Sequence, residues 1–168
     1  SATDRTYGSA PHATGAAYTP AVADCEHWFK VVVSDADGVR FEREFFFSRL
    51  PVCYIEVANG AVPSVNKEEH DATIRIQGNG AYAQQYDGAT TIHVRGNSTK
   101  GYPKKPWKIK LDKKTDVFGL GGGVKNKHWV LLANYLDECM MRNTIGFRLA
   151  DALGVANMKT EWVDVILN

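Results

Sequence analysis

The change of hydrophobic period along the chain constrains its fold most. Five segments combine β-branched or aromatic residues with flanking turns rich in Gly and Asn, which is typical of strands. They are 52–57, 73–77, 90–95, 107–111 and 128–132. Apolar residues then recur at intervals of three and four from Leu136 to Leu153, with Asp137 as a predicted N-cap and Gly154 at the C′ position, so one helix is predicted there. Residues 162–167 predict a last strand. Strands and helices do not alternate, which predicts an α+β fold with a mainly antiparallel β-sheet and one packed helix.

The first 48 residues carry a different pattern. Residues 1–24 hold almost no large aliphatic side chains, which predicts a flexible arm or linker. The β-rich runs 29–34 and 39–47 flank an Asp-Ala-Asp-Gly turn, which indicates a hairpin. We interpret 25–48 as the end of a small β-sandwich-like module and 49–168 as a second domain. An arm of this composition stays ordered only when something holds it, so residues 1–24 are a candidate for self-assembly.

The composition excludes several classes of protein. Apolar residues make up 44% and charged residues 23%, as in globular proteins, which excludes a disordered chain, a collagen and a coiled coil. No apolar run reaches the ~18 residues that a membrane-spanning helix needs. Cys25, Cys53 and Cys139 lack the spacing of a zinc site. Cys53 lies in an apolar run typical of a buried thiol, and a Cys25–Cys53 disulfide is the alternative for a secreted chain.

The charge of the chain is distributed unevenly. Lys and Arg number 20 against 19 Asp and Glu, a net charge of +1. Between Arg95 and Lys114, however, eight basic residues face one acid, Asp112, so this segment is +7 and the remainder −6. Such a local excess favours a localised anion such as a phosphate, and it argues against nucleic acid as a partner. A solvated strand face is the alternative interpretation.

Polar side chains that suit a phosphate gather in the turn and strand of this basic segment. The turn offers hydroxyls, backbone N–H groups and a guanidinium fork, which together could hold the oxygens of a di- or triphosphate. The candidate residues are Arg95, Asn97, Ser98, Lys105 and Lys108. A second polar group, Asp137 and Arg142, lies near the predicted helix start, where Asp137 either caps the helix or contributes to a site. The run Gly119–Gly123 lacks the Gly-Lys-Ser/Thr ending of a P-loop and is predicted to be a flexible loop.

Three stretches are specific enough to indicate a family: Arg95-Gly-Asn-Ser-Thr, Tyr102-Pro-Lys-Lys-Pro-Trp-Lys-Ile-Lys-Leu and Lys127-His-Trp-Val-Leu-Leu-Ala-Asn-Tyr. With them, residues 50–168 resemble the amino-terminal part of the spore-coat protein H (CotH) kinase family. The resemblance implies a kinase-like amino-terminal lobe of a secreted or surface atypical Ser/Thr protein kinase. Such an enzyme uses ATP with Mg²⁺ or another divalent metal, and its partners are coat or surface proteins. Its location would be extracellular, on the cell surface or in the spore coat.

By this resemblance Lys105 or Lys108 would meet the nucleotide phosphates, Arg95 and Ser98 would lie at the turn, and residues near Asp137 would position them. Two departures matter. Lys100 stands where the family usually has an aromatic residue, and the sequence ends at Asn168, before the lobe that carries the acidic residues for metal and catalysis. We therefore expect a nucleotide-binding portion that holds no catalytic residue and is inactive as this 168-residue piece. The alternatives are a non-catalytic structural or adhesive module of an extracellular assembly and a polyanion-binding module.

Overall fold

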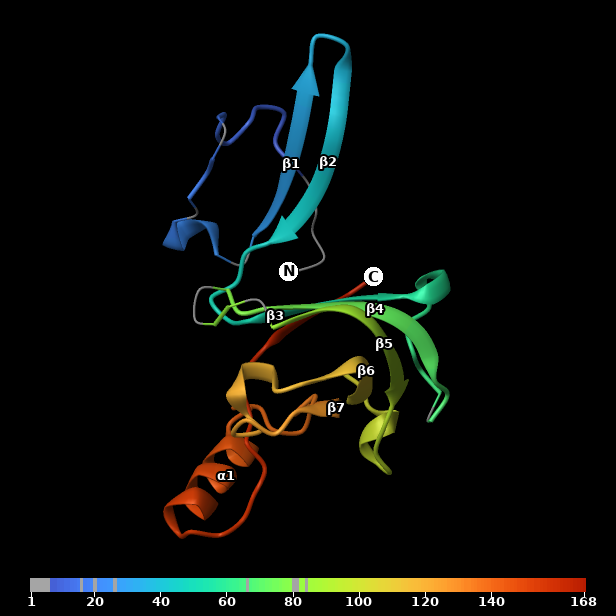
Figure 1. Ribbon diagram of the computed structural model, residues 1–168, viewed down its shortest axis with the longest axis vertical. Helices are drawn as coiled ribbons and strands as arrows, with labels where there is room; N and C mark the ends of the chain where they lie inside the picture. Colours follow the sequence, from blue (N-terminus) through green and yellow to red (C-terminus); the bar gives the residue numbers. More distant parts are fainter. Residues whose placement is uncertain are drawn as a thin grey trace. The chain divides into compact units, whose positions relative to one another are not determined.

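The computed structural model describes residues 7–168 except 16, 20, 26, 66, 80, 81 and 84. The chain divides into two compact units, Ser1–Arg49 and Leu50–Asn168 (Figure 1). Each unit is described by itself. No helix among the described residues is long and apolar enough to cross a membrane.

The first unit contains the predicted hairpin. Strand β1 (Trp28–Asp35) pairs antiparallel with β2 (Gly38–Phe46), with a register shift after Val33. Ahead of it lies a short 3-10 helix, η1 (Val22–Asp24). Tyr18 stacks on Phe29 at 6.1 Å between ring centroids and donates its hydroxyl hydrogen bond to Asp24, so part of the segment before η1 lies against the hairpin. Within the described residues this unit has no third strand, and the sandwich-like module stays a prediction.

The second unit is built on a six-stranded sheet. Its strands are β3 (Val52–Val57), β4 (His70–Gln77), β5 (Tyr86–Val94), β6 (Trp107–Thr115), β7 (Asn126–Leu131) and β8 (Asp164–Leu167). Their order across the sheet is β7-β6-β5-β4-β3-β8. Every neighbouring pair is antiparallel except β3 and β8, which are parallel. The described residues form one α-helix, α1 (Arg142–Ala152), so the predicted α+β class and the mainly antiparallel sheet are confirmed. Short 3-10 turns occupy Ala58–Gly60 (η2), Thr99–Gly101 (η3) and Val117–Gly119 (η4).

The core lies on one face of this curved sheet. β-Branched residues alternate with polar ones along each strand, so Ile55, Ile74, Ile92 and Ile109 all point to the same side and are at most 2% exposed. Burying each such side chain contributes about 1.5–3 kcal/mol. Because the apolar residues occupy this face, the polar residues between them must share the opposite face of the sheet.

The cysteines contribute no cross-link. Cys25, Cys53 and Cys139 are free thiols, so the Cys25–Cys53 disulfide considered from the sequence is not formed. Cys53 belongs to the core of the second unit, as expected of a thiol in an apolar run. Burial raises the pKa of its thiol to about 12.

Helix α1 begins later than its periodicity predicts. The expected start near Leu136 is wrong, because Asn134 and Met140 adopt left-handed φ angles of 48° and 55° and the chain between them makes two tight turns. The helix therefore starts at Arg142. Its end agrees with the prediction: Gly154 has φ 68° and donates its N–H to the carbonyl of Asp151, a geometry that glycine adopts without steric cost.

The helix does not bury its apolar residues as a packed helix would. Among the described residues, none of those in α1 falls in the buried class. Ile145 and Leu149 are 56% and 59% exposed. The single helix is thus confirmed, whereas its apolar side chains lie on the surface.

Candidate anion-binding site

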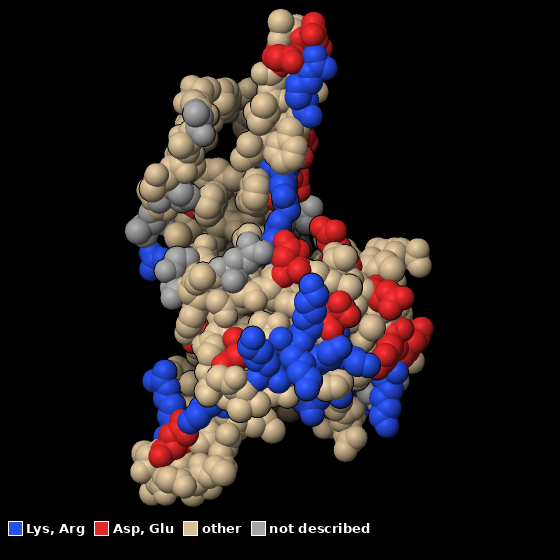
Figure 2. Space-filling view, in the orientation of Figure 1, with Lys and Arg blue, Asp and Glu red and all other residues tan. Residues whose placement is uncertain are grey.

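The face of the sheet opposite the core carries a group of basic residues that we call the basic face: Lys67, His93, Arg95, Lys108 and Lys110. Strand alternation places the last two there, because their neighbours Ile109 and Leu111 are buried in the core. In the register of the sheet, Lys108 lies opposite His93 on β5, and Lys110 lies opposite His128 on β7. Figure 2 shows a gathering of Lys and Arg side chains over the second unit.

A cavity of about 330 Å³ opens beside this face and is lined by Lys67, His93, Arg95, Gly96 and Asn97. Backbone bonds fix its walls. The N–H of Arg95 donates to the carbonyl of Pro106 at 3.1 Å, and the N–H of Lys67 donates to the carbonyl of Val94 at 3.1 Å. The loop can therefore present a guanidinium, an amide and backbone groups to one small volume.

Gly96 is needed for this turn to close. Its φ is 102°, and a Cβ placed on it would lie 2.1 Å from the Oγ1 of Thr99. A side chain would thus meet both backbone strain and a steric clash. The Gly in the Arg-Gly-Asn-Ser-Thr stretch therefore has a conformational role, which holds Arg95 and Asn97 at the cavity.

Among the described residues, the basic face holds more positive charge than its one ion pair, between His93 and Glu69, can neutralise. In the described part of the chain, none of Lys67, Arg95, Lys108 and Lys110 forms an ion pair. The Oε1 of Glu69 lies 3.8 Å from the Nδ1 of His93, which lines the cavity. Several cations that share one surface without counter-charges create a positive potential, which attracts anions to it.

Lys105 has a different role from its neighbours. Its Nζ donates to the carbonyl oxygens of Lys100 at 2.8 Å and Tyr102 at 3.4 Å, so it ties together the loop around η3. Ser98 precedes η3, is exposed and makes no capping bond with its side chain. Of the residues predicted for phosphate, Arg95 and Asn97 line the cavity, Lys108 lies opposite a lining residue, and Ser98 and Lys105 belong to the adjoining loop.

Asp137 and Arg142 form a separate cluster at the start of α1. The Oδ2 of Asp137 accepts the backbone N–H of Arg142 at 2.7 Å, and its Oδ1 accepts the thiol of Cys139 at 3.0 Å. The pKa of this buried carboxyl is lowered, chiefly by the Cys139 bond and then by the N–H and charge of Arg142. Asp137 therefore accepts the first N–H of α1 without being its N-cap, because Met141 holds that position and makes no side-chain cap bond. The predicted N-cap at Asp137 is wrong, and its part in a site stays a prediction.

One aromatic contact joins the two clusters. The rings of Tyr102 and Tyr135 stack at 5.2 Å between centroids with an interplanar angle of 22°. Tyr102 follows η3, and Tyr135 precedes Asp137 by two residues. The stack holds the loop of the basic segment against the chain that leads into α1.

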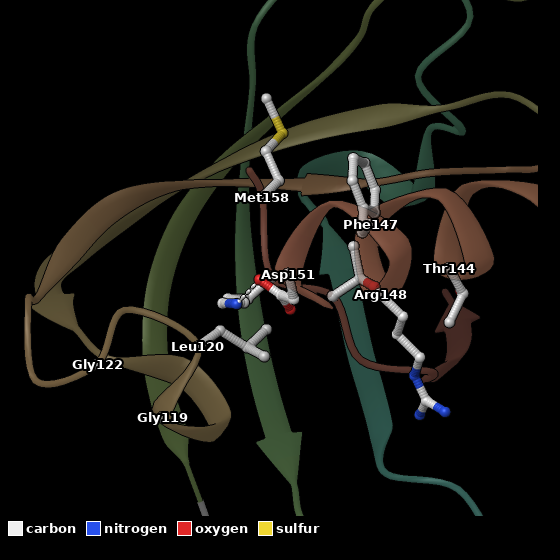
Figure 3. Close-up of a pocket in the computed structure, with 10 residues that line it drawn as sticks. Gly119, Leu120, Gly122, Thr144, Phe147, Arg148, Asp151 and Met158 are labelled. Carbon is white, nitrogen blue, oxygen red and sulfur yellow. Dashed lines mark hydrogen bonds and ion pairs between the residues drawn. The ribbon is translucent and has the colours of Figure 1, made fainter. Parts of the chain in front are cut away.

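A second cavity, of about 340 Å³, lies between α1 and the glycine-rich loop (Figure 3). Phe147, Arg148 and Asp151 project from the helix, and Leu120 lies on the facing loop. The carboxylate of Asp151 is already bound by the ammonium of Lys159 and the amide of Asn157. In this cavity Asp151 and Lys159 therefore form an ion pair, whereas Lys67 and Arg95 of the first cavity form none among the described residues.

The described residues do not form a protein metal site. Among them there is no group of three or more His, Cys, Asp and Glu side chains placed to hold an ion. The donors present suit phosphate oxygens, which accept hydrogen bonds from cations and amides, and they do not suit a divalent cation.

Comparison with known proteins gives one family match, which covers part of the chain. Residues 92–168, which include the end of β5 and all of β6, β7, α1 and β8, match the family described as CotH kinase protein. The predicted resemblance to the CotH family is confirmed. The match covers somewhat less than half of the chain and includes Arg95, Asn97 and Lys108. Neither a curated protein nor a solved structure gives a significant match.

Two residues that line this cavity were missed from the sequence. His93 could have been found, because it alternates with the buried Ile92 and Val94 and so must face the same side as Lys108. Lys67 gave no such signal. It lies between η2 and β4 and has a φ of 64°. It reaches the cavity because its backbone N–H donates a hydrogen bond to the carbonyl of Val94.

Proposed function

We propose that the second unit is the nucleotide-binding portion of a CotH-type protein kinase and that the cavity beside the basic face takes the phosphate groups. The CotH family match supports a kinase-like domain. The observation that carries the proposal is the cavity lined by Lys67, His93 and Arg95, whose two permanent cations have no carboxylate partner among the described residues. A polyphosphate supplies the missing negative charge.

Each residue would contribute a different interaction with the phosphates. The planar guanidinium of Arg95 can donate two parallel bonds to one phosphate, and the amide of Asn97 can donate to a second oxygen. Lys108, one register position from the cavity wall, supplies a mobile point charge. Lys105 would keep the η3 loop in place through the carbonyls of Lys100 and Tyr102 instead of touching the phosphates.

ATP, when bound, supplies the transferable phosphoryl group, and in kinases a divalent ion bridges its phosphates. The residues described here account for the binding and orientation of phosphates only. In the described part of the chain no acidic cluster is placed for metal, so no catalytic step is assigned to this unit. We propose that phosphoryl transfer needs groups beyond those of this unit.

The proposal is tested by nucleotide binding measured with isothermal titration calorimetry. Removing one charged donor costs about 1.5–3 kcal/mol, so Arg95→Ala is expected to weaken ATP binding roughly 10- to 100-fold. Lys108→Ala is expected to weaken it about tenfold. Lys113→Ala removes an exposed cation farther along the same strand, and it serves as the matched control with affinity close to that of the original chain.

Lys105→Ala separates positioning from direct contact. This variant is expected to lower the melting temperature of the chain, because Nζ of Lys105 donates to two carbonyls of the η3 loop. Its affinity for ATP is expected to fall less than that of Lys108→Ala. Binding of ATP that is unchanged in both Arg95→Ala and Lys108→Ala would refute this phosphate site. If ATP binding weakens as much in Lys113→Ala as in Arg95→Ala and Lys108→Ala, the effect comes from the net charge of the chain and the site assignment is wrong.

A non-catalytic structural module of an extracellular assembly is the second candidate. The large exposed apolar surface of α1 favours it, since such surfaces usually contact another molecule. We propose, from the CotH resemblance, a location outside the cell, on its surface or in a spore coat, with coat or surface proteins as partners. A chain that binds no nucleotide but co-assembles with other chains would favour this function over the kinase.

A further inference from the structure

The cavity beside the basic face is lined by two kinds of basic side chain. Lysine and arginine stay cationic between about pH 5 and pH 8, whereas histidine gains a proton within this range. Lys67, Arg95 and His93 all line the cavity. The positive charge at this cavity therefore rises as the pH falls, and His93 is the lining residue that raises it.

The ring of His93 is placed where its charge acts on the cavity. The side chain is 15% exposed, and a charge shielded from water acts more strongly on its neighbours than a charge on an open surface. Its Nδ1 lies 3.8 Å from the Oε1 of Glu69. Among the described residues, no hydrogen bond reaches the other ring nitrogen, Nε2. When both nitrogens carry protons, Nδ1 can thus face Glu69 while Nε2 donates to a ligand.

The charged groups near His93 leave an excess of positive charge. Among the described residues, the cavity lining and the strand register place these groups near it: Lys67, Glu69, Asp71, Arg95, Lys108 and Lys110. The side chain of Glu69 is 56% exposed, so it neutralises a nearby cation only weakly. Asp71 is exposed as well, and it lies opposite Thr91 instead of His93. A proton on His93 therefore adds to a charge that an anion from solution balances.

We propose that His93 makes the anion affinity of this cavity depend on pH, with a protonated ring strengthening the hold on a phosphate and a neutral ring weakening it. This inference rests on the proposed phosphate site and adds its regulation. A charged donor forms hydrogen bonds about twice as strong as those of a neutral donor. Proton and anion then favour each other's binding, and by linkage each changes the affinity of the other by the same factor. We expect a factor of about ten, as for one added charged hydrogen bond.

The test is an NMR titration of the 168-residue chain with sulfate at about pH 8 and at about pH 5.5. Sulfate stays a dianion throughout this range, whereas a phosphate group gains a proton within it, so a change in sulfate affinity comes from the protein. Sodium chloride keeps the ionic strength constant, because salt screens surface charges. The affinity for sulfate is expected to rise about tenfold at the lower pH. Sulfate should also move the titration of the His93 ring signal to higher pH, by about one pH unit.

Two histidine variants separate His93 from general protonation of the chain. His93→Gln keeps a polar side chain that cannot gain a charge, and it is expected to bind sulfate equally at both pH values. His128→Gln is the matched control. It removes an exposed histidine that lies opposite Lys110 and does not line the cavity, and it is expected to keep the tenfold rise. Circular dichroism checks that both variants stay folded.

The outcomes distinguish this regulation from the proposed function. If ATP binds at the higher pH and depends on Arg95, but sulfate affinity does not rise at the lower pH, the regulation is overturned and the phosphate site stands. A rise that survives His93→Gln, or that disappears in His128→Gln, also overturns the regulation. If neither ATP nor sulfate binds at either pH, the phosphate site itself is refuted, and its regulation with it.

Discussion

The loop after β6 is folded around a single carboxylate, and removing that carboxylate gives a stringent test of the structure. The Oδ1 of Asp116 accepts the N–H of Gly121 at 2.6 Å, and its Oδ2 accepts the N–H of Gly123 at 2.7 Å. Gly121 itself has no room for a side chain, since a Cβ would lie 2.1 Å from the carbonyl oxygen of Val124. The glycine run thus encloses an anion that the chain itself provides.

The expected cost of Asp116→Ala follows from these two bonds. Hydrogen bonds to a charged group contribute about 1.5–3 kcal/mol each when shielded and about 0.5 kcal/mol when water can replace them. The Gly121 bond is partly buried and the Gly123 bond is exposed. The sum is about 2 kcal/mol, which for a unit of this size lowers the melting temperature by roughly 6–10 °C.

The assay is thermal unfolding followed by tryptophan fluorescence, with Asp112→Ala as the matched control. Asp112 is an exposed acid on β6, and its loss is expected to change stability by less than about 0.5 kcal/mol. Small carboxylates such as formate should partly restore Asp116→Ala by entering the emptied ring of N–H groups. A melting temperature equal to that of the control, with no response to formate, would refute the reasoning.

Two further predictions concern titratable groups. The folded pKa of Asp137 is lowered, so its stabilisation of α1 is present above the ordinary value of 3.8 and is lost as pH falls through the folded value. Asp137→Asn should remove the acid transition that the helical circular dichroism signal shows below pH 3.8, and an unchanged transition would contradict the role of Asp137 at the start of α1. Burial and a pKa of about 12 should keep Cys53 unreactive toward a thiol reagent at pH 8, while the exposed Cys139 reacts. Equal rates for Cys53→Ser and Cys139→Ser chains would show that Cys53 is accessible.

Much of the fold follows from local patterns in the sequence. The bounds of β3 agree with the expected 52–57, because its alternation is clear and Pro51 and the Asn59 turn limit it. β5 extends back to Tyr86, beyond the expected start at 90, since Gly88 with φ 158° stays extended inside the strand. Patterns read from nearby residues carry no information on which distant strands pair, so the parallel pairing of β3 with β8 could not be predicted.

The site was predictable in part for the same reason. Arg95, Asn97 and Lys108 lie in one polar turn and the strand after it, where spacing alone indicates a shared face. Whether a given lysine is available depends on its tertiary contacts. Lys105 and Lys108 look alike in the sequence, yet the first is held by two backbone carbonyls, whereas the second is half-buried and lies opposite His93 on the neighbouring strand.

The pairing of β8 with β3 has a consequence for how this unit is made. Asn168 donates its backbone N–H to the carbonyl of Ile55 at 2.9 Å, and its side-chain oxygen accepts the N–H of Val57, 111 residues earlier in the sequence. During synthesis the edge of β3 that pairs with β8 therefore stays unpaired until almost all of the unit has left the ribosome. Closing so long a loop makes folding slow, in the millisecond-to-second range of proteins dominated by distant contacts. A nascent chain arrested before residue 164 should consequently be the form of this protein most prone to aggregate.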